Sequence, residues 1–207
     1  MPIDVELILT CLRQNWVWQL GDNHPLGWSI TAGYAVATAL AALVVLRAPF
    51  ASDTRGRERV FWILVMLFLL FMMINKQLNL QTTLREAGRC VSQAEGWYRT
   101  RGAVQEQFVL WLTGALALTG LAMLWWMRKA LLRNLPALTG CTMLAFFILV
   151  RAADIANVQR LVRWEFLEIG GHRWLEFAGI AFVLAGAMWI LRQGGHARDL
   201  GARRRAR

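Results

Sequence analysis

The sequence predicts an all-α, polytopic transmembrane helix bundle with about five spans and an amino-terminal interfacial helix. Of its 207 residues, 57% are apolar and only 17% are charged, and tryptophan occurs 11 times. This composition is typical of membrane proteins. Fifteen consecutive apolar residues run from Val60 to Ile74, and a soluble protein rarely buries such a run on every face. Four further stretches are apolar enough and long enough to span a bilayer.

The first segment, residues 1–24, is too polar for a span because it contains four charged residues. Its apolar side chains nevertheless recur at helical spacing, at Val5, Ile8, Leu9, Leu12 and Trp16. We therefore expect a short amphipathic helix on the membrane surface, ended by the turn region from Gly21 to Pro25. The segment lacks the cationic start, apolar core and cleavage site of a signal peptide.

Residues 25–192 form the predicted bundle. At about 1.5 Å per residue, crossing about 30 Å of hydrocarbon takes roughly 20 residues. Five stretches meet this requirement, namely residues 28–46, 60–80, 108–127, 136–157 and 174–191. In the second stretch, Lys76 is expected to reach toward the headgroups. Several tryptophans near the predicted ends indicate an aromatic belt at the interface: Trp28, Trp62, Trp125, Trp126, Trp174 and Trp189.

The longest connection covers residues 81–105 and is predicted to be external and helical. Its polar residues continue the helical face of Asn75 and Asn79, which favours one continuous helix projecting beyond the bilayer. Gly96 and Gly102 bracket an amphipathic patch expected to return along the membrane surface.

The chain has three cysteines. Cys11 and Cys90 both fall on the predicted outer side, where an oxidising compartment would allow them to pair, although two isolated thiols are also consistent with the pattern. Cys141 lies near the predicted cytoplasmic end of the fourth span and is expected to stay reduced.

Positive charge is distributed unevenly and predicts the topology. Thirteen cationic residues follow the first span, fill the short third connection or follow the last span, where residues 193–207 form a basic tail. Nine lie on the other side over longer segments, and Arg151 is inside a span. Because cationic loops mark the cytoplasmic face, we predict an external amino terminus and a cytoplasmic carboxyl terminus.

The net charge of +10 raises the question of nucleic-acid binding, for which the tail from Arg203 to Arg207 is the candidate. A basic tail beside a membrane already sets topology and contacts anionic lipid. We therefore expect the lipid bilayer as partner, together with other membrane proteins or a second copy, and no nucleic acid.

Ionisable residues within the spans indicate a polar layer in the outer leaflet, and such residues often mark function. Counted from the cytoplasmic end of each helix, Lys76 lies roughly 24 Å from Val60, Arg151 roughly 22 Å from Pro136, and Glu176 roughly 24 Å from Arg192. Asp154 lies one turn beyond Arg151 on the same face. The candidate ligand-binding layer comprises Asn75, Lys76, Asn79, Arg151, Asp154 and Glu176, with Thr31 and Thr113 at similar depth.

Two interpretations of this layer remain open. Mutual pairing of two cations and two anions would neutralise the layer, and such a network can serve helix packing alone. Alternatively, the layer lines an outward-opening cavity for a lipid headgroup or another small polar molecule. Lys76 and Arg151 would then contact an anionic group.

The sequence indicates neither a metal site nor a catalytic motif. His172 and Glu176 share a helix face, and Asp154 can approach them, which makes a weak metal candidate without the H-E-x-x-H signature. There is no G-x-S-x-G elbow, paired-cysteine motif or phosphate-binding glycine loop. The cofactor is therefore unknown.

The segment Asn75-Lys76-Gln77-Leu78-Asn79-Leu80-Gln81 resembles a family of small uncharacterised bacterial membrane proteins with an N-K-Q-L-D-L-Q element, some of them mislabelled isopropylmalate isomerase. The resemblance extends through the Gly96-Trp97-Tyr98 turn and implies a bacterial inner (plasma) membrane location, without an activity. The family's fourth span resembles R-A-A-S-F-H-H-x-D. Here Arg151-Ala152-Ala153 is followed by Asp154-Ile155-Ala156-Asn157, so both histidines and the terminal aspartate are missing.

These observations favour a non-enzymatic inner-membrane protein, an accessory or ligand-binding subunit. Small residues would permit close packing within the bundle or with a partner: Ala32, Gly33, Ala37, Gly114, Ala117, Gly179 and Gly186. The alternative is an intramembrane enzyme acting on a lipid or phosphorylated small molecule, with Asp154 or Glu176 as general base. A transporter component is the third hypothesis, since no inverted repeat or broken helix is visible.

Overall fold

A computed structural model of the protein describes residues 6, 10–11, 24–48, 50, 53–78, 80–94, 96, 101–152, 165–166 and 169–205. Among these residues, five helices are long and apolar enough to cross a membrane, which confirms the predicted all-α polytopic bundle. Two very short strands, β1 (Glu165–Phe166) and β2 (Ile169–Gly170), pair in antiparallel fashion just before the last helix.

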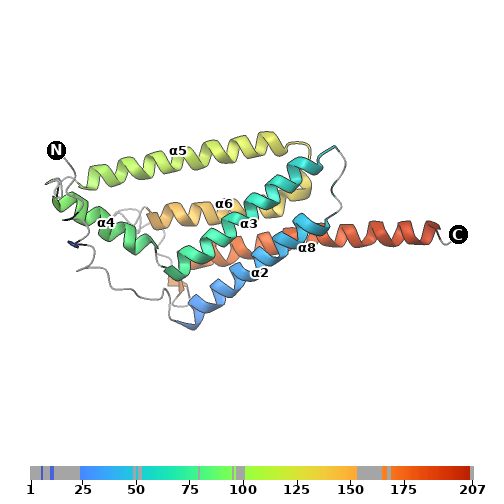
Figure 1. The fold of residues 1–207 in the computed structure, drawn as a ribbon, viewed down its shortest axis with the longest axis horizontal. Helices are drawn as coiled ribbons and strands as arrows, with labels where there is room; N and C mark the ends of the chain where they lie inside the picture. The colour runs from blue at the N-terminus through green and yellow to red at the C-terminus, as the bar shows by residue number, and fades with distance from the viewer. Residues whose placement is uncertain are drawn as a thin grey trace.

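The helices are α2 (Pro25–Arg47), α3 (Arg55–Leu78), α4 (Leu80–Ala94), α5 (Arg101–Met127), α6 (Leu131–Ala152) and α8 (Gly171–Arg205). The local sequence explains where α2 begins. Pro25 occupies the first turn of α2, where its missing N–H is not needed, and the Nδ1 atom of His24 accepts a hydrogen bond from the Leu26 N–H at 3.3 Å. The basic tail predicted at residues 193–207 continues α8 as far as Arg205, and Figure 1 shows it projecting beyond the other helices.

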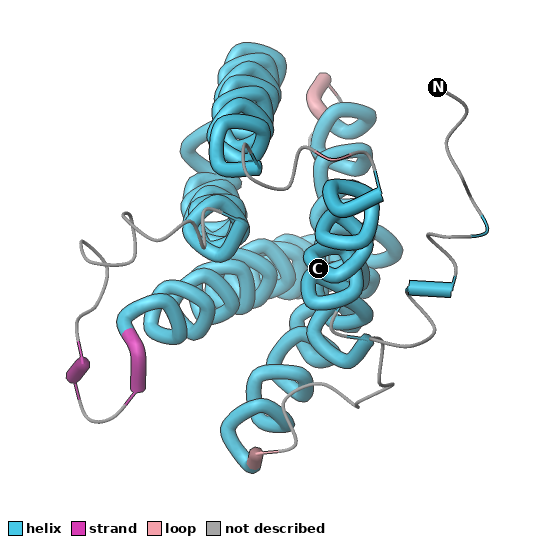
Figure 2. The backbone as a smooth tube through the Cα atoms, turned by 90° about the vertical axis from the view of Figure 1, so that its left-hand side faces the viewer, coloured by secondary structure: helices cyan, strands magenta, loops and turns pink. Residues whose placement is uncertain are grey.

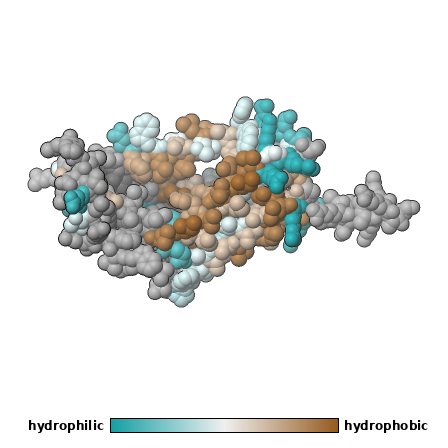
Figure 3. All heavy atoms as spheres, viewed as in Figure 1, coloured by the Kyte–Doolittle hydropathy of each residue, from teal (hydrophilic) through white to brown (hydrophobic). Residues whose placement is uncertain are grey.

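Four of the helices form the packed bundle. Helix α8 packs along α6 and α2, and α2 also packs along α3. Figure 2 shows the crossing helices from another side, and α5 packs mainly against α6. In α5, residues 107–126 are exposed or half-buried, and Met127 is its buried residue. Figure 3 shows apolar residues over the middle of the molecule and polar residues at the end near the α5–α6 connection.

Two helices approach so closely that glycine is required at their crossing. A Cβ atom added at Gly140 of α6 would lie 2.6 Å from the backbone oxygen of Gly179 in α8, and one at Gly186 would lie 2.9 Å from the Ala137 nitrogen. Small residues allow such close backbone contact in membrane helices. Gly179 and Gly186 therefore serve packing inside the bundle, whereas Gly114 and Ala117 of α5 are exposed.

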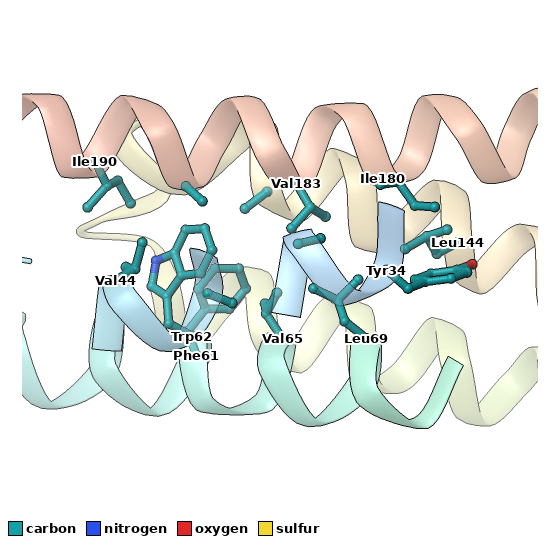
Figure 4. Packing of buried hydrophobic residues seen from close by; sticks show 14 of the residues in the cluster. Tyr34, Val44, Phe61, Trp62, Val65, Leu69, Leu144, Ile180, Val183 and Ile190 are labelled. Carbon is teal, nitrogen blue, oxygen red and sulfur yellow. The ribbon is translucent and has the colours of Figure 1, made fainter. Parts of the chain in front are cut away.

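Trp62 corrects the prediction of an interfacial ring at that position. It is completely buried, and its ring lies edge-on to Phe61, with the two centroids 5.7 Å apart. Figure 4 shows it in the row of core side chains that continues through Val65 and Leu69. The indole is inside because its N–H finds a buried acceptor there, as a buried tryptophan requires. Trp28, Trp125, Trp174 and Trp189 are exposed.

The connection after α3 also differs from the prediction of one continuous helix. The structure has two helices, α3 and α4, whose axes point in different directions (Figure 1). A disulfide joins Cys90 of α4 to Cys11, with a Cα–Cα distance of 6.0 Å. The sequence allowed this pairing without requiring it. The bond links α4 to the amino-terminal segment. Beyond α4, Gly96 adopts a left-handed φ of 77°, which favours glycine after a helix end.

Of the predicted interfacial helix at residues 1–24, the structure describes Glu6, Thr10 and Cys11 as helical. Thr10 donates a hydrogen bond from its hydroxyl to the Glu6 backbone oxygen at 2.8 Å. Position on a membrane surface stays a prediction. The fourth span begins at Leu131, earlier than predicted, with Pro136 inside the helix.

Candidate functional site

Three helices bring polar groups together around Glu176, which is buried in the first turns of α8. The hydroxyl of Tyr34 on α2 donates a hydrogen bond to Glu176 Oε1 at 3.0 Å. The ammonium of Lys76 on α3 lies 3.1 Å from Glu176 Oε2, and the side chains of this ion pair are 6% and 1% exposed. We call Tyr34, Lys76 and Glu176 the Glu176 network.

The antiparallel arrangement of the helices explains this meeting. Tyr34 lies early in α2, Lys76 lies late in α3, and Glu176 lies early in α8, so all three reach the same end of the bundle. A buried carboxylate is tolerated only when it is paired and hydrogen-bonded. Here both oxygens of Glu176 accept a bond, and Lys76 compensates its charge.

Beside this network lies a small cavity. Its lining comes from α3, α6 and α8, and comprises Met72, Asn75, Lys76, Phe147, Arg151 and Glu176. The volume is about 10 Å³, which is room for about one water molecule. Arg151 is half-buried, and its guanidinium carbon lies 5.9 Å from the centre of the Phe147 ring. Lys76, Arg151 and Glu176, which the sequence placed at similar depth, thus line one cavity, and ligand binding by them stays a prediction.

The two threonines of the predicted layer, Thr31 and Thr113, lie in different surroundings. Thr31 accepts a hydrogen bond from the Gln77 side-chain amide at 2.9 Å and so lies near the Glu176 network. Thr113 does not belong to it, because its side chain is exposed on α5 and donates to the Val109 backbone oxygen within that helix. Equal depth did not predict contact here, because α5 packs mainly against α6 and leaves Thr113 exposed.

Other predicted site residues lie outside the described part of the chain. These are Asn79 and Asp154, together with the side chain of His172, whose backbone begins α8. Among the described residues, no three His, Cys, Asp or Glu side chains gather in a way that would hold a metal ion. The weak metal candidate formed by His172 and Glu176 therefore stays a prediction.

A second polar cluster, which the sequence analysis missed, surrounds Glu58 at the opposite end of α3. The Glu58 side chain is 1% exposed. It accepts hydrogen bonds from the Thr54 hydroxyl at 2.6 Å and from the Asn134 amide at 3.2 Å. Asn134 in turn accepts a bond from the Trp62 indole N–H at 2.9 Å. An Arg133 nitrogen lies 3.7 Å from Glu58 Oε2.

We call Thr54, Glu58, Trp62, Arg133 and Asn134 the Glu58 network. It fastens the start of α3 to the start of α6. The signal that could have revealed it was Glu58 itself, because it is an acidic residue among arginines at the start of an apolar run. Trp62 lies one turn later, on the same helix face.

Comparison with protein-family models, with curated proteins and with solved structures finds no match to this chain. The resemblance to the N-K-Q-L-D-L-Q family therefore stays a prediction.

Proposed function

We propose that the protein is a non-enzymatic protein of a bacterial inner membrane and acts there as an accessory or ligand-binding subunit. The observation that carries this proposal is the cavity at which Asn75, Lys76, Arg151 and Glu176 converge from three helices. Polar and charged groups gathered between membrane helices are costly, and they commonly mark a ligand pathway. A network serving packing alone would account for Tyr34, Lys76 and Glu176, but it gives no reason for Arg151 to line the same cavity.

The geometry favours binding over catalysis. Glu176, one of the two general bases considered for an enzyme, already accepts bonds at both oxygens, from Tyr34 and Lys76. A general base needs an oxygen within hydrogen-bond reach of the substrate proton. The other base considered, Asp154, lies outside the described residues.

The test is retention of a small molecule or lipid through purification. The full chain would be extracted in mild detergent and examined by native mass spectrometry, alongside Asn75→Phe, which fills the cavity. Leu64→Phe is the matched control, because Leu64 lies on the same helix and is exposed to the surroundings. We expect wild type and the control to retain a bound molecule that Asn75→Phe loses. Equal retention by all three would contradict the proposal.

We also propose that the amino terminus is external and the carboxyl terminus cytoplasmic. Two independent features support this orientation: the thirteen cationic residues on one side, and the Cys11–Cys90 disulfide on the other, since disulfides persist in oxidising compartments.

Labelling of single cysteines with a membrane-impermeant reagent tests the orientation. The probes are Gln93→Cys and Lys129→Cys, both at exposed positions, whereas neighbouring Ala130 is buried and unsuitable. Cys141→Ala serves as the background. We expect intact cells to label the first probe only, and the reverse pattern would overturn the orientation.

A further inference from the structure

The charges around the cavity do not balance among the described residues. Lys76 is within ion-pair distance of Glu176, and that carboxylate also holds Tyr34. Arg151 lines the same cavity and contacts the Phe147 ring. In the part of the chain that the structure describes, no carboxylate lies within ion-pair distance of Arg151. The described lining therefore carries two cations and one anion.

We infer that Arg151 binds an oxygen of a phosphate group, with the Asn75 carboxamide as a second donor. This inference rests on the proposed function and names the ligand class of that site. A guanidinium presents several N–H donors in one plane, which suits phosphate oxygens better than the single point charge of a lysine. The Phe147 ring beside the guanidinium restricts its orientation.

The cavity size defines how much of the ligand enters. A volume of about 10 Å³ holds about one oxygen-sized group and not a whole phosphate. One phosphate oxygen therefore occupies the cavity, while the rest of the group and its substituents remain outside it. The site therefore selects for negative charge and does not discriminate among the substituents of the phosphate.

The position of Arg151 favours a lipid phosphodiester as the source of that phosphate. Arg151 shares the cavity with Glu176, which lies in the first turns of α8 directly after β2, and membrane helices reach the headgroup region near their ends. A free phosphate offers the same chemistry, so the experiment must separate the two sources.

The experiment measures binding of defined probes to the purified full chain by native mass spectrometry. The probes are dioctanoyl phosphatidylglycerol, uncharged dioctanoylglycerol and inorganic phosphate. The variant is Arg151→Gln, and the matched control is Arg128→Gln. Arg128 is also placed over an aromatic ring, 5.5 Å from the centre of Trp125, but at the other end of the bundle. A melting curve for each variant establishes that it is folded.

We expect wild type and Arg128→Gln to bind the phospholipid equally, and Arg151→Gln to bind it about tenfold or more weakly, as loss of a charge-assisted hydrogen bond predicts. Competition by inorganic phosphate would identify free phosphate as a ligand of the same site. Equal weakening by both variants, or none by Arg151→Gln, would overturn the inference. Binding of dioctanoylglycerol that Asn75→Phe abolishes, without phospholipid binding, would overturn the phosphate inference and leave the proposed function standing. Absence of any bound molecule or probe would overturn both.

Discussion

At one end of α3, Glu58 is enclosed by a hydroxyl, by the amide of an asparagine that is itself bonded to an indole, and by a partly exposed arginine. At the other end, Glu176 is held by a phenol and a buried ammonium, and a cavity with a second cation adjoins it. The first carboxylate is stabilised mainly by neutral donors, and the second depends on one opposite charge. The same bundle therefore contains one polar cluster that closes a helix junction and one that leaves a cationic side chain available.

The largest expected difference between the two networks follows from removing each carboxylate charge. Glu176→Gln leaves the Lys76 ammonium buried beside a neutral amide, which should cost about 3 kcal/mol or more of unfolding free energy. Glu58→Gln should cost roughly half as much on the same scale, because the Arg133 side chain is 22% exposed and can turn toward water. Equilibrium unfolding in detergent micelles would measure both losses, and equal losses would show that the two carboxylates depend equally on an opposite charge.

A double-mutant cycle measures the strength of each ion pair directly. Adding Lys76→Met to Glu176→Gln removes the buried cation as well as the anion, and we expect a coupling of about 2 kcal/mol. The parallel cycle of Arg133→Met with Glu58→Gln should give less than about 1 kcal/mol, since partly exposed ion pairs are weak. If the second cycle gave the larger coupling, Glu58 would be the charge-dependent site.

Removing a neutral hydrogen-bonding group should lower the unfolding free energy more in the Glu58 network than in the Glu176 network. Asn134→Leu removes the acceptor of Trp62 and a donor to Glu58, for an expected loss of about 2 kcal/mol. Tyr34→Phe removes one donor from a carboxylate that keeps Lys76, for about 1 kcal/mol. The midpoints of the same unfolding titrations report this order, which a larger Tyr34→Phe effect would contradict.

The smallest expected effect is that of Arg151→Gln on stability. Its described contact is the Phe147 ring, so we expect a change within about 0.5 kcal/mol. Arg133→Gln, which withdraws a cation from Glu58, should cost about 1 kcal/mol. A large loss for Arg151→Gln in the melting curve would assign Arg151 to the packing network and remove its availability for a ligand.

Depth could be predicted from the sequence because the rise per residue of a helix is nearly constant. For this reason the count along three spans placed Lys76, Arg151 and Glu176 together, as the structure has them. Rotation about a helix axis and the choice of neighbour depend on packing, which the count does not contain. Thr113 was therefore assigned to a layer that its helix does not join, and Trp62 was placed at an interface when it lies in the core.

The partners of each carboxylate were harder to predict. Tyr34 was missed because a tyrosine within an apolar span resembles any other aromatic residue until its hydroxyl finds an acceptor. Asn134 was missed because the sequence placed it in a short basic connection, where a polar residue is expected to be solvated, whereas it lies in the first turn of α6. Both belong to networks between residues more than 70 positions apart in sequence, with separations of 142 and 76.

The Cys11–Cys90 disulfide reports on membrane insertion, because it can form only if both cysteines reach the same side of the bilayer. Its two cysteines are 79 residues apart, and the helices α2 and α3 lie between them. Two thiols can join only on one side of a bilayer, so the chain between them crosses an even number of times. During biosynthesis the bond can close only after both of these helices have been inserted as a hairpin. Its oxidation state in a newly made chain would therefore show whether α2 and α3 had both been inserted.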